Sequence, residues 1–186
     1  DFNMFTSEGV RHRSRVNFIY SGSLQKWHLP NEVIKYFEIV QKKFGDKVHL
    51  KFCTNNIEEA ILLFQNSNLP SNCFTIKNVP FNEIGEEYSS ADIGFCLIKN
   101  SFSKAVCFPV KFSEYIASNI FVITNRGIGD LPQIVEEYNC GIVIDDVNDF
   151  NKNGKELINL VQKFFDSKIM KYNKSDLPFL DWNKEG

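Results

Sequence analysis

Short runs of apolar residues alternate along the chain with longer segments in which apolar positions recur at the spacing of a helix face. The short runs are rich in β-branched and aromatic residues and predict strands at 16–21, 48–53, 74–79, 92–98, 120–124 and 141–144. The helix-spaced segments predict helices at 31–43, 57–66, 82–89, 110–117, 131–138 and 150–169. The run at 92–98 is almost continuously apolar, which is typical of a strand buried on both faces of a sheet.

Strands that alternate with helices in this way predict an α/β fold, with a doubly wound, Rossmann-like parallel sheet of six strands. We expect this domain to span 16–170, after a junction or linker at 1–15 and before a C-terminal tail at 171–186. The commonest order of six such strands is 3-2-1-4-5-6, and ligands bind at the carboxyl ends where the order reverses, between the first and fourth strands. The loops at 21–30, 97–109 and 125–129 are therefore the candidate binding loops.

Composition narrows the possible partners. The 186 residues suffice for one well-packed domain, and 21 Lys and Arg against 23 Asp and Glu give a formal net charge of −2. Such a chain has no general attraction for nucleic acid or an anionic membrane surface, so any anion site must be local. No apolar run approaches the roughly 18 to 20 residues of a membrane span and no secretory leader is visible, so we expect a cytoplasmic protein. Because the chain begins with Asp1, we expect a piece of a longer gene product.

Cysteine and histidine positions argue against a metal site. The five cysteines contain no CxxC pair and mostly lie in apolar segments, which fits a reducing compartment; they are Cys53, Cys73, Cys96, Cys107 and Cys140. The three histidines are scattered, without a second ligand at metal-binding spacing, so no metal is expected. A basic cluster at 11–15 lacks the interleaved aromatic residues of a nucleic-acid face, so a solvated approach to the first strand is the simpler interpretation.

The loop after the first predicted strand could bind phosphate. Gly22 permits a tight turn and close backbone approach, while the hydroxyls of Ser21 and Ser23 and the ammonium of Lys26 could meet a phosphate group. An ordinary strand-to-helix turn with a solvated lysine is equally compatible with these residues. Neither GxGxxG nor GxxxxGK[ST] is present, so this is not a dinucleotide fingerprint or a P-loop.

The helix predicted at 110–117 carries a more informative pattern at its start. The backbone amides around Val106, Phe108 and Val110 could bind an anion at the positive end of the helix dipole. Lys111 and Glu114 are spaced i, i+3 and share one helix face. A lysine in the first turn opposes the helix dipole, and an anionic ligand would remove this conflict. The alternative is a surface ion pair that stabilises the helix by a few tenths of a kcal/mol.

The loop at 125–129 follows a predicted buried strand. Gly127 and Gly129 could allow the backbone to approach a ligand, with Arg126 as a further cation. An ordinary glycine-rich connection fits these residues equally well.

Together these segments resemble the carboxyl-terminal, donor-binding domain of retaining glycosyltransferases of family four (group 1), which have the GT-B fold. The resemblance lies in YSGSL at 20–24, IGEEYSSADIG at 84–94, PVKFSEYIA at 109–117, FVITN at 121–125, GDLPQIV at 129–135 and CGIV at 140–143. The P-x-K-x-x-E-Y-x-A run, followed by an apolar strand and a glycine-containing loop, is the most specific part. DFNMF at 1–5 is similar to the interdomain junction of these enzymes.

The resemblance implies that three residues act directly in catalysis. Glu114 would accept hydrogen bonds from the ribose hydroxyls of a nucleotide sugar, and Lys26 would meet its diphosphate. Lys111 would be a further cation at the diphosphate, whose departure cations and helix-terminal amides can stabilise without an acid, a base or a metal. No metal and no cofactor are expected.

The resemblance also implies the residues that bind the nucleotide sugar. Asn78 and Val79 would contact the base through their backbone. Gly22 and Ser23 would face the donor from the first loop. The amides of Val106, Cys107 and Phe108 would face its phosphate or sugar.

These features predict the donor-binding domain of a retaining, hexosyl-type glycosyltransferase in polysaccharide biosynthesis. It would transfer sugar from a nucleoside-diphosphate sugar to a glycan or lipid-linked acceptor held mainly by a missing amino-terminal domain, and the full-length protein could associate peripherally with a membrane. Val106 stands where the family's Glu-x7-Glu motif has its first glutamate, and Gln133 replaces a usual glutamate. A non-catalytic nucleotide-sugar-binding or interaction module is therefore the alternative. A Rossmann oxidoreductase shares the sheet but lacks the glycine fingerprint.

Overall fold

Six strands and six α-helices alternate in a computed structural model of the chain, which describes residues 14–24, 26–101 and 108–166. The strands are β1 (Val16–Ser21), β2 (Val48–Cys53), β3 (Phe74–Lys77), β4 (Ile93–Cys96), β5 (Phe121–Asn125) and β6 (Gly141–Ile144). The α-helices are α1 (Pro30–Phe44), α2 (Ile57–Gln65), α3 (Ile84–Ser89), α4 (Val110–Ala117), α5 (Leu131–Glu137) and α6 (Phe150–Phe165). Short 3-10 turns at Gly45–Lys47 and Ser71–Cys73 precede β2 and β3.

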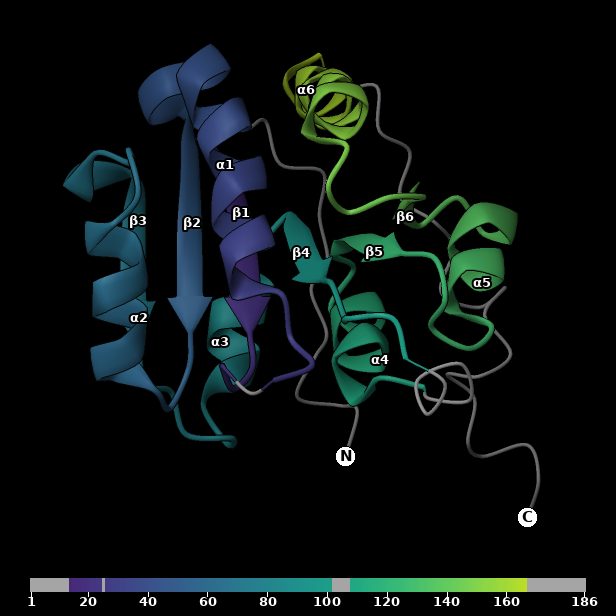
Figure 1. Cartoon of the computed structure of the whole chain (residues 1–186), viewed down its shortest axis with the longest axis horizontal. Coiled ribbons are helices and arrows are strands. Elements are labelled where there is room, and N and C mark those ends of the chain that lie inside the picture. Colours follow the sequence, from purple (N-terminus) through teal and green to yellow (C-terminus); the bar gives the residue numbers. More distant parts are fainter. Residues whose placement is uncertain (1–13, 25, 102–107, 167–186) are drawn as a thin grey trace.

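All six strands join one parallel sheet in the order β3-β2-β1-β4-β5-β6 (Figure 1). This confirms the predicted fold class and strand order. The order reverses between β1 and β4, which pair through Phe18 with Ile93 and Ile19 with Gly94. Every residue of β4 is buried, as its continuous apolar sequence predicted, because helices cover the sheet on both faces.

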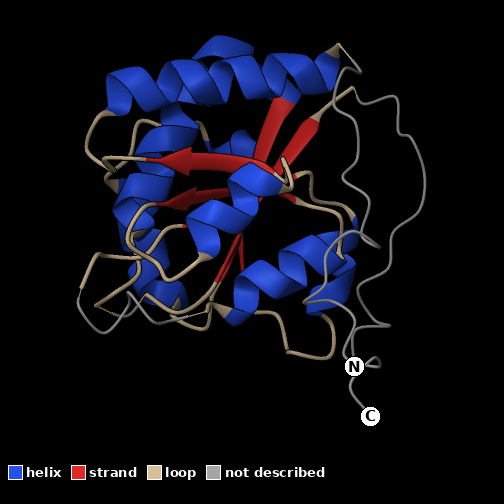
Figure 2. Ribbon diagram, turned by 90° about the vertical axis from the view of Figure 1, so that its right-hand side faces the viewer, coloured by secondary structure: helices blue, strands red, loops and turns tan. Residues whose placement is uncertain are grey.

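Helices lie on both faces of the sheet (Figure 2). The core consists of two apolar clusters, one on each face. Side chains from α1, α2 and α6 form one cluster, which is rich in stacked and edge-on phenylalanines such as Phe18, Phe37 and Phe95. Side chains from α3, α4 and α5 form the other. None of the described helices is long and apolar enough to cross a membrane.

Several predicted boundaries are wrong, including the end of β3, which lies at Lys77 rather than at 79. β4 ends at Cys96 rather than 98, because Ile98 leaves the sheet and forms an antiparallel bridge with His28. α3 begins at Ile84 rather than 82, because the Glu83 amide closes a turn on the carbonyl of Pro80 at 3.0 Å. α6 ends at Phe165, whereas the pattern predicted a helix to 169.

Candidate functional site

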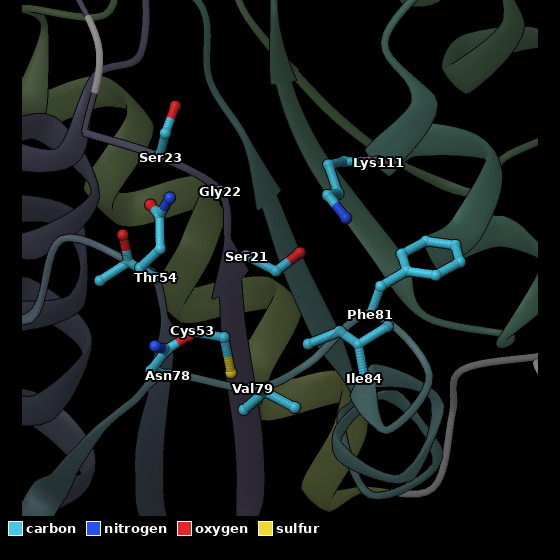
Figure 3. A pocket seen from close by; sticks show the side chains of 11 residues that line it. Ser21, Gly22, Ser23, Cys53, Thr54, Asn78, Val79, Phe81, Ile84 and Lys111 are labelled. Atoms are coloured by element: carbon cyan, nitrogen blue, oxygen red, sulfur yellow. The ribbon is translucent and has the colours of Figure 1, made fainter.

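A pocket of about 240 Å³ opens at the carboxyl ends of β1, β2 and β3 (Figure 3). Its lining comes from two strand ends, three loops and two helices, and consists of Ser21, Gly22, Ser23, Cys53, Thr54, Asn55, Asn78, Val79, Phe81, Ile84 and Lys111. In a parallel sheet the strand ends that point the same way meet at one edge, which is why residues so distant in sequence share this site. The lining combines one cation, hydroxyl and amide groups, and an apolar wall.

Lys111 and Glu114 form the charged part of the site. Lys111 lines the pocket, and its Nζ donates to Oε2 of Glu114 at 2.7 Å. Glu114 is only 4% exposed. Lys111 and Glu114 therefore form the pair that their i, i+3 spacing predicted. Since one partner is buried and the other lines a pocket, the pair differs from the surface ion pair that was the alternative.

A buried hydrogen-bond chain also holds Glu114 at the oxygen that accepts from Lys111. Tyr88 in α3 donates its hydroxyl to Oε2 of Glu114 at 2.8 Å, and its oxygen lies 2.6 Å from Oγ of Ser21 at the end of β1. Tyr115 accepts from the Ser21 amide at 3.0 Å and lies 3.3 Å from Oγ of Ser21. The ring of Tyr115 packs on Gly94, where a Cβ atom would stand 2.6 Å from it. Glycine in β4 is therefore required for this packing.

Burial keeps the phenol groups of Tyr88 and Tyr115 protonated. Desolvation, followed by the charges of Tyr115 and Glu114, raises the pKa of Tyr88 well above its usual range. Complete burial likewise raises the pKa of Tyr115. Both side chains consequently retain a proton to donate near neutral pH.

Cys53 lines the pocket, and its thiol is held in the protonated form near neutral pH. Burial and then the nearby carboxylate of Glu87 raise the pKa of its thiol to about 11. Glu87 itself is held by Lys51 and Lys77, each at 2.6 Å. Burial opposes ionisation of Glu87, but these hydrogen bonds outweigh it and lower its pKa.

Hydrogen bonds within the loop after β1 and to the end of β2 hold the polar groups of this loop. The amide of Gly22 donates to the carbonyl of Cys53 at 3.0 Å, so it is already engaged. The carbonyl of Ser23 accepts from the Tyr20 hydroxyl at 2.8 Å and lies 2.7 Å from Nδ1 of His28. Lys26 is exposed on this loop and is not among the residues that line the pocket. Its role at a phosphate stays a prediction.

The loop after β5 does not line the pocket. Arg126, the candidate cation of this loop, pairs instead with Glu136 in α5 and with Asp145 after β6. Gly127 and Gly129 have positive φ angles of 86° and 44°, which the turn into α5 requires. The structure therefore favours the ordinary connection for this loop.

The structure brings part of the predicted site together. Gly22, Ser23, Asn78, Val79 and Lys111 line the pocket, and Glu114 accepts a hydrogen bond from Lys111. Phe108 is 43% exposed before α4, with its ring edge-on to Phe112 and outside the lining. Val106 and Cys107 lie outside the described residues.

Several residues of the site were not identified from the sequence. Thr54 and Phe81 line the pocket from the loops after β2 and β3, which the strand-order rule did not select. The sequence could have indicated both residues, because each closely follows the end of a predicted strand. Tyr88 and Tyr115 had no such signal, since their partners are remote in sequence.

The described residues contain no group of three or more His, Cys, Asp or Glu side chains placed to hold a metal ion. The chemistry of the lining suits an amphipathic, anionic ligand. Lys111 offers a cation, Thr54 and Asn78 offer polar groups, and Val79 with the 68% exposed Phe81 offers an apolar surface.

One family model matches most of the chain. A family model described as glycosyl transferases group 1 matches residues 7–174. No curated protein matches the chain in sequence.

Solved structures of glycosyltransferases share the fold. The C-terminal domain of LpcC, a glycosyl transferase group 1 family protein from Francisella tularensis, has a TM-score of 0.73 at 16% identity, over 96% of this chain and 97% of that one. WaaG, a glycosyltransferase involved in lipopolysaccharide biosynthesis, has a TM-score of 0.59 at 13% identity, over 93% of this chain and 48% of that one. The pneumococcal O-GlcNAc transferase GtfA, solved with UDP and GlcNAc, has a TM-score of 0.57 at 12% identity, over 88% of this chain and 31% of that one. The chain thus spans about half the length of WaaG and less than a third of GtfA.

Proposed function

Since this chain belongs to the group 1 glycosyl transferases, we propose that its pocket binds a nucleoside-diphosphate sugar and that the whole enzyme transfers the sugar to a glycan or lipid-linked acceptor. The single observation that carries this proposal is the buried Glu114 held by Tyr88 and paired with the pocket-lining Lys111. A cation beside hydroxyl groups and an apolar wall suits the diphosphate, ribose and base of one ligand.

In this proposal, Lys111 attracts the diphosphate and stabilises the charge that develops on it as the sugar leaves. Glu114 accepts from the ribose hydroxyls through its carboxylate, and Asn78 with Val79 lies along the base. The reaction needs no metal, so EDTA is expected to leave transfer unchanged. The acceptor would be held by an amino-terminal domain, and the sugar would keep its anomeric configuration. Cytoplasmic location and peripheral membrane association stay predictions.

Isothermal titration of the 186-residue chain with UDP and GDP tests the binding step. Lys111→Gln removes a charge-assisted hydrogen bond and is expected to weaken binding by about 10- to 100-fold. Glu114→Gln is expected to weaken it about tenfold, because a neutral amide accepts less strongly. Glu136→Gln, which removes one partner of an exposed ion pair away from the pocket, is the matched control and is expected to leave binding unchanged.

Failure of every nucleoside diphosphate to bind would contradict the proposal. Binding without transfer or donor hydrolysis by the full-length protein would instead favour the non-catalytic module. Retention is tested by proton NMR of the anomeric centre of the product, and an inverted product would refute it.

A further inference from the structure

The pocket contains a serine whose hydroxyl has its proton committed elsewhere. Ser21 lines the pocket at the end of β1 and is 7% exposed. Figure 3 shows its hydroxyl directed to the same side of the pocket as the ammonium of Lys111. Its Oγ lies 2.6 Å from the hydroxyl oxygen of Tyr88 and 3.3 Å from that of Tyr115.

The direction of each hydrogen bond between Glu114, Tyr88 and Ser21 follows from the charge of the Glu114 carboxylate. As the carboxylate of an ion pair with Lys111, Glu114 can only accept, so the single phenolic proton of Tyr88 points to Oε2. At 2.6 Å from Ser21, the oxygen of Tyr88 must therefore accept, and the single proton of Ser21 is the one donated to it. Tyr115 accepts from the Ser21 amide, and its own proton can point to Oγ of Ser21.

We propose that Tyr88 is a positioning residue that makes the Ser21 hydroxyl a hydrogen-bond acceptor toward the pocket, so that Ser21 selects a ligand group that donates. Ser21 Oγ then presents only lone pairs to a ligand. A phosphate oxygen, which also presents only lone pairs, is repelled there. The part of a bound nucleoside diphosphate that lies against Ser21 is therefore a hydroxyl or ring N–H, and the phosphates lie toward Lys111.

This inference deepens the proposed function and rests on it. UDP and GDP are titrated first, and the nucleotide that binds more tightly is used throughout. Its analogues lack the 2′-hydroxyl, lack the 3′-hydroxyl, or carry a methyl group on the ring N–H. One of these deletions is expected to weaken binding to the unmodified chain about threefold to tenfold, the effect of one neutral hydrogen bond. The same deletion is expected to leave the affinity of Ser21→Ala for the nucleotide unchanged.

A second comparison isolates the positioning role of Tyr88. In Tyr88→Phe the Ser21 proton loses its acceptor at 2.6 Å and turns toward the pocket, because the more distant Tyr115 oxygen already accepts from the Ser21 amide and directs its own proton to Ser21 Oγ. An analogue in which fluorine replaces the identified hydroxyl, or a carbonyl-like acceptor replaces the identified N–H, is then tolerated better relative to the parent nucleotide. The ratio of the two dissociation constants is expected to fall by about threefold or more from its value in the unmodified chain. A merely structural role for Tyr88 would weaken both ligands equally and leave this ratio unchanged.

Tyr115→Phe is the matched control, because it removes a buried phenol next to Ser21 and leaves the Ser21 proton on Tyr88. Its ratio is expected to equal that of the unmodified chain. Equal costs of every deletion in the unmodified chain and Ser21→Ala would overturn the inference, as would an unchanged ratio in Tyr88→Phe. Those results leave the proposed function standing, whereas the absence of any nucleotide binding would overturn both.

Discussion

Replacement of Asn125 by alanine should destabilise the protein more than its size suggests. Asn125 is 1% exposed at the end of β5, and its side chain ties this strand to the segment that follows β4. Oδ1 accepts from the amide of Ile98 at 2.9 Å, and Nδ2 donates to the carbonyl of Ile98 at 3.0 Å and to that of Arg126 at 2.9 Å. Asn100 Oδ1 is a further acceptor at 3.1 Å.

The expected cost follows from the backbone groups that lose their partners. Ile98 is 6% exposed, so its amide and carbonyl have little access to water in place of the lost side chain. Each buried polar group left without a partner costs about 1–3 kcal/mol. Asn125→Ala is therefore expected to lower the free energy of unfolding by about 2–6 kcal/mol and Tm by roughly 4–24 °C.

Urea and thermal unfolding followed by circular dichroism measure this loss. Thr124→Val is the matched control, because Thr124 is the fully buried neighbour and donates only one bond, to the carbonyl of Cys96 at 3.2 Å. Its expected cost is about 1 kcal/mol. A loss in Asn125→Ala no larger than that in Thr124→Val would refute the reasoning, since it would show that Ile98 is not stranded without partners.

Two further predictions concern His49 and Gly94. Burial, followed by the charges of Arg15 and Lys51, lowers the pKa of His49 to about 4, so between its ordinary value of 6.5 and this value only the unfolded state binds the proton. The free energy of unfolding should fall by about 1–2 kcal/mol over this window as pH decreases, allowing for solvent screening, and it should fall less in His49→Gln. Urea unfolding of both proteins at pH 4–7 measures this, and an equal fall in the two proteins would disprove it. Gly94→Ala places a Cβ 2.6 Å from the Tyr115 ring and should cost about 1–3 kcal/mol through overpacking, with weaker nucleotide binding. Gly45→Ala, where φ is 57° and nothing lies within 4 Å, is the control that changes stability alone, and equal nucleotide binding by both variants would contradict the argument.

The alternation of apolar runs and helix-spaced segments determined the fold to a large extent. The predicted bounds of β1, β2, β6 and α4 agree with the structure, and so does the strand order. This works because a strand buried on both faces must be apolar throughout, while a helix on a sheet needs only one apolar face. The Lys111–Glu114 pair was also predictable, since residues three positions apart on a helix are neighbours whatever surrounds the helix.

Tertiary structure decided what surrounds that pair. Ser21 and Tyr88 are 67 positions apart, and no local pattern indicates that β1 and α3 bring their hydroxyl groups to 2.6 Å. The pocket uses the ends of β1, β2 and β3, while Arg126, which looked equally available in the sequence, is engaged by Glu136 and Asp145. Local periodicity follows from burial on one face, whereas a site depends on which strand ends and helix turns meet in space, and only packing of the whole chain specifies that.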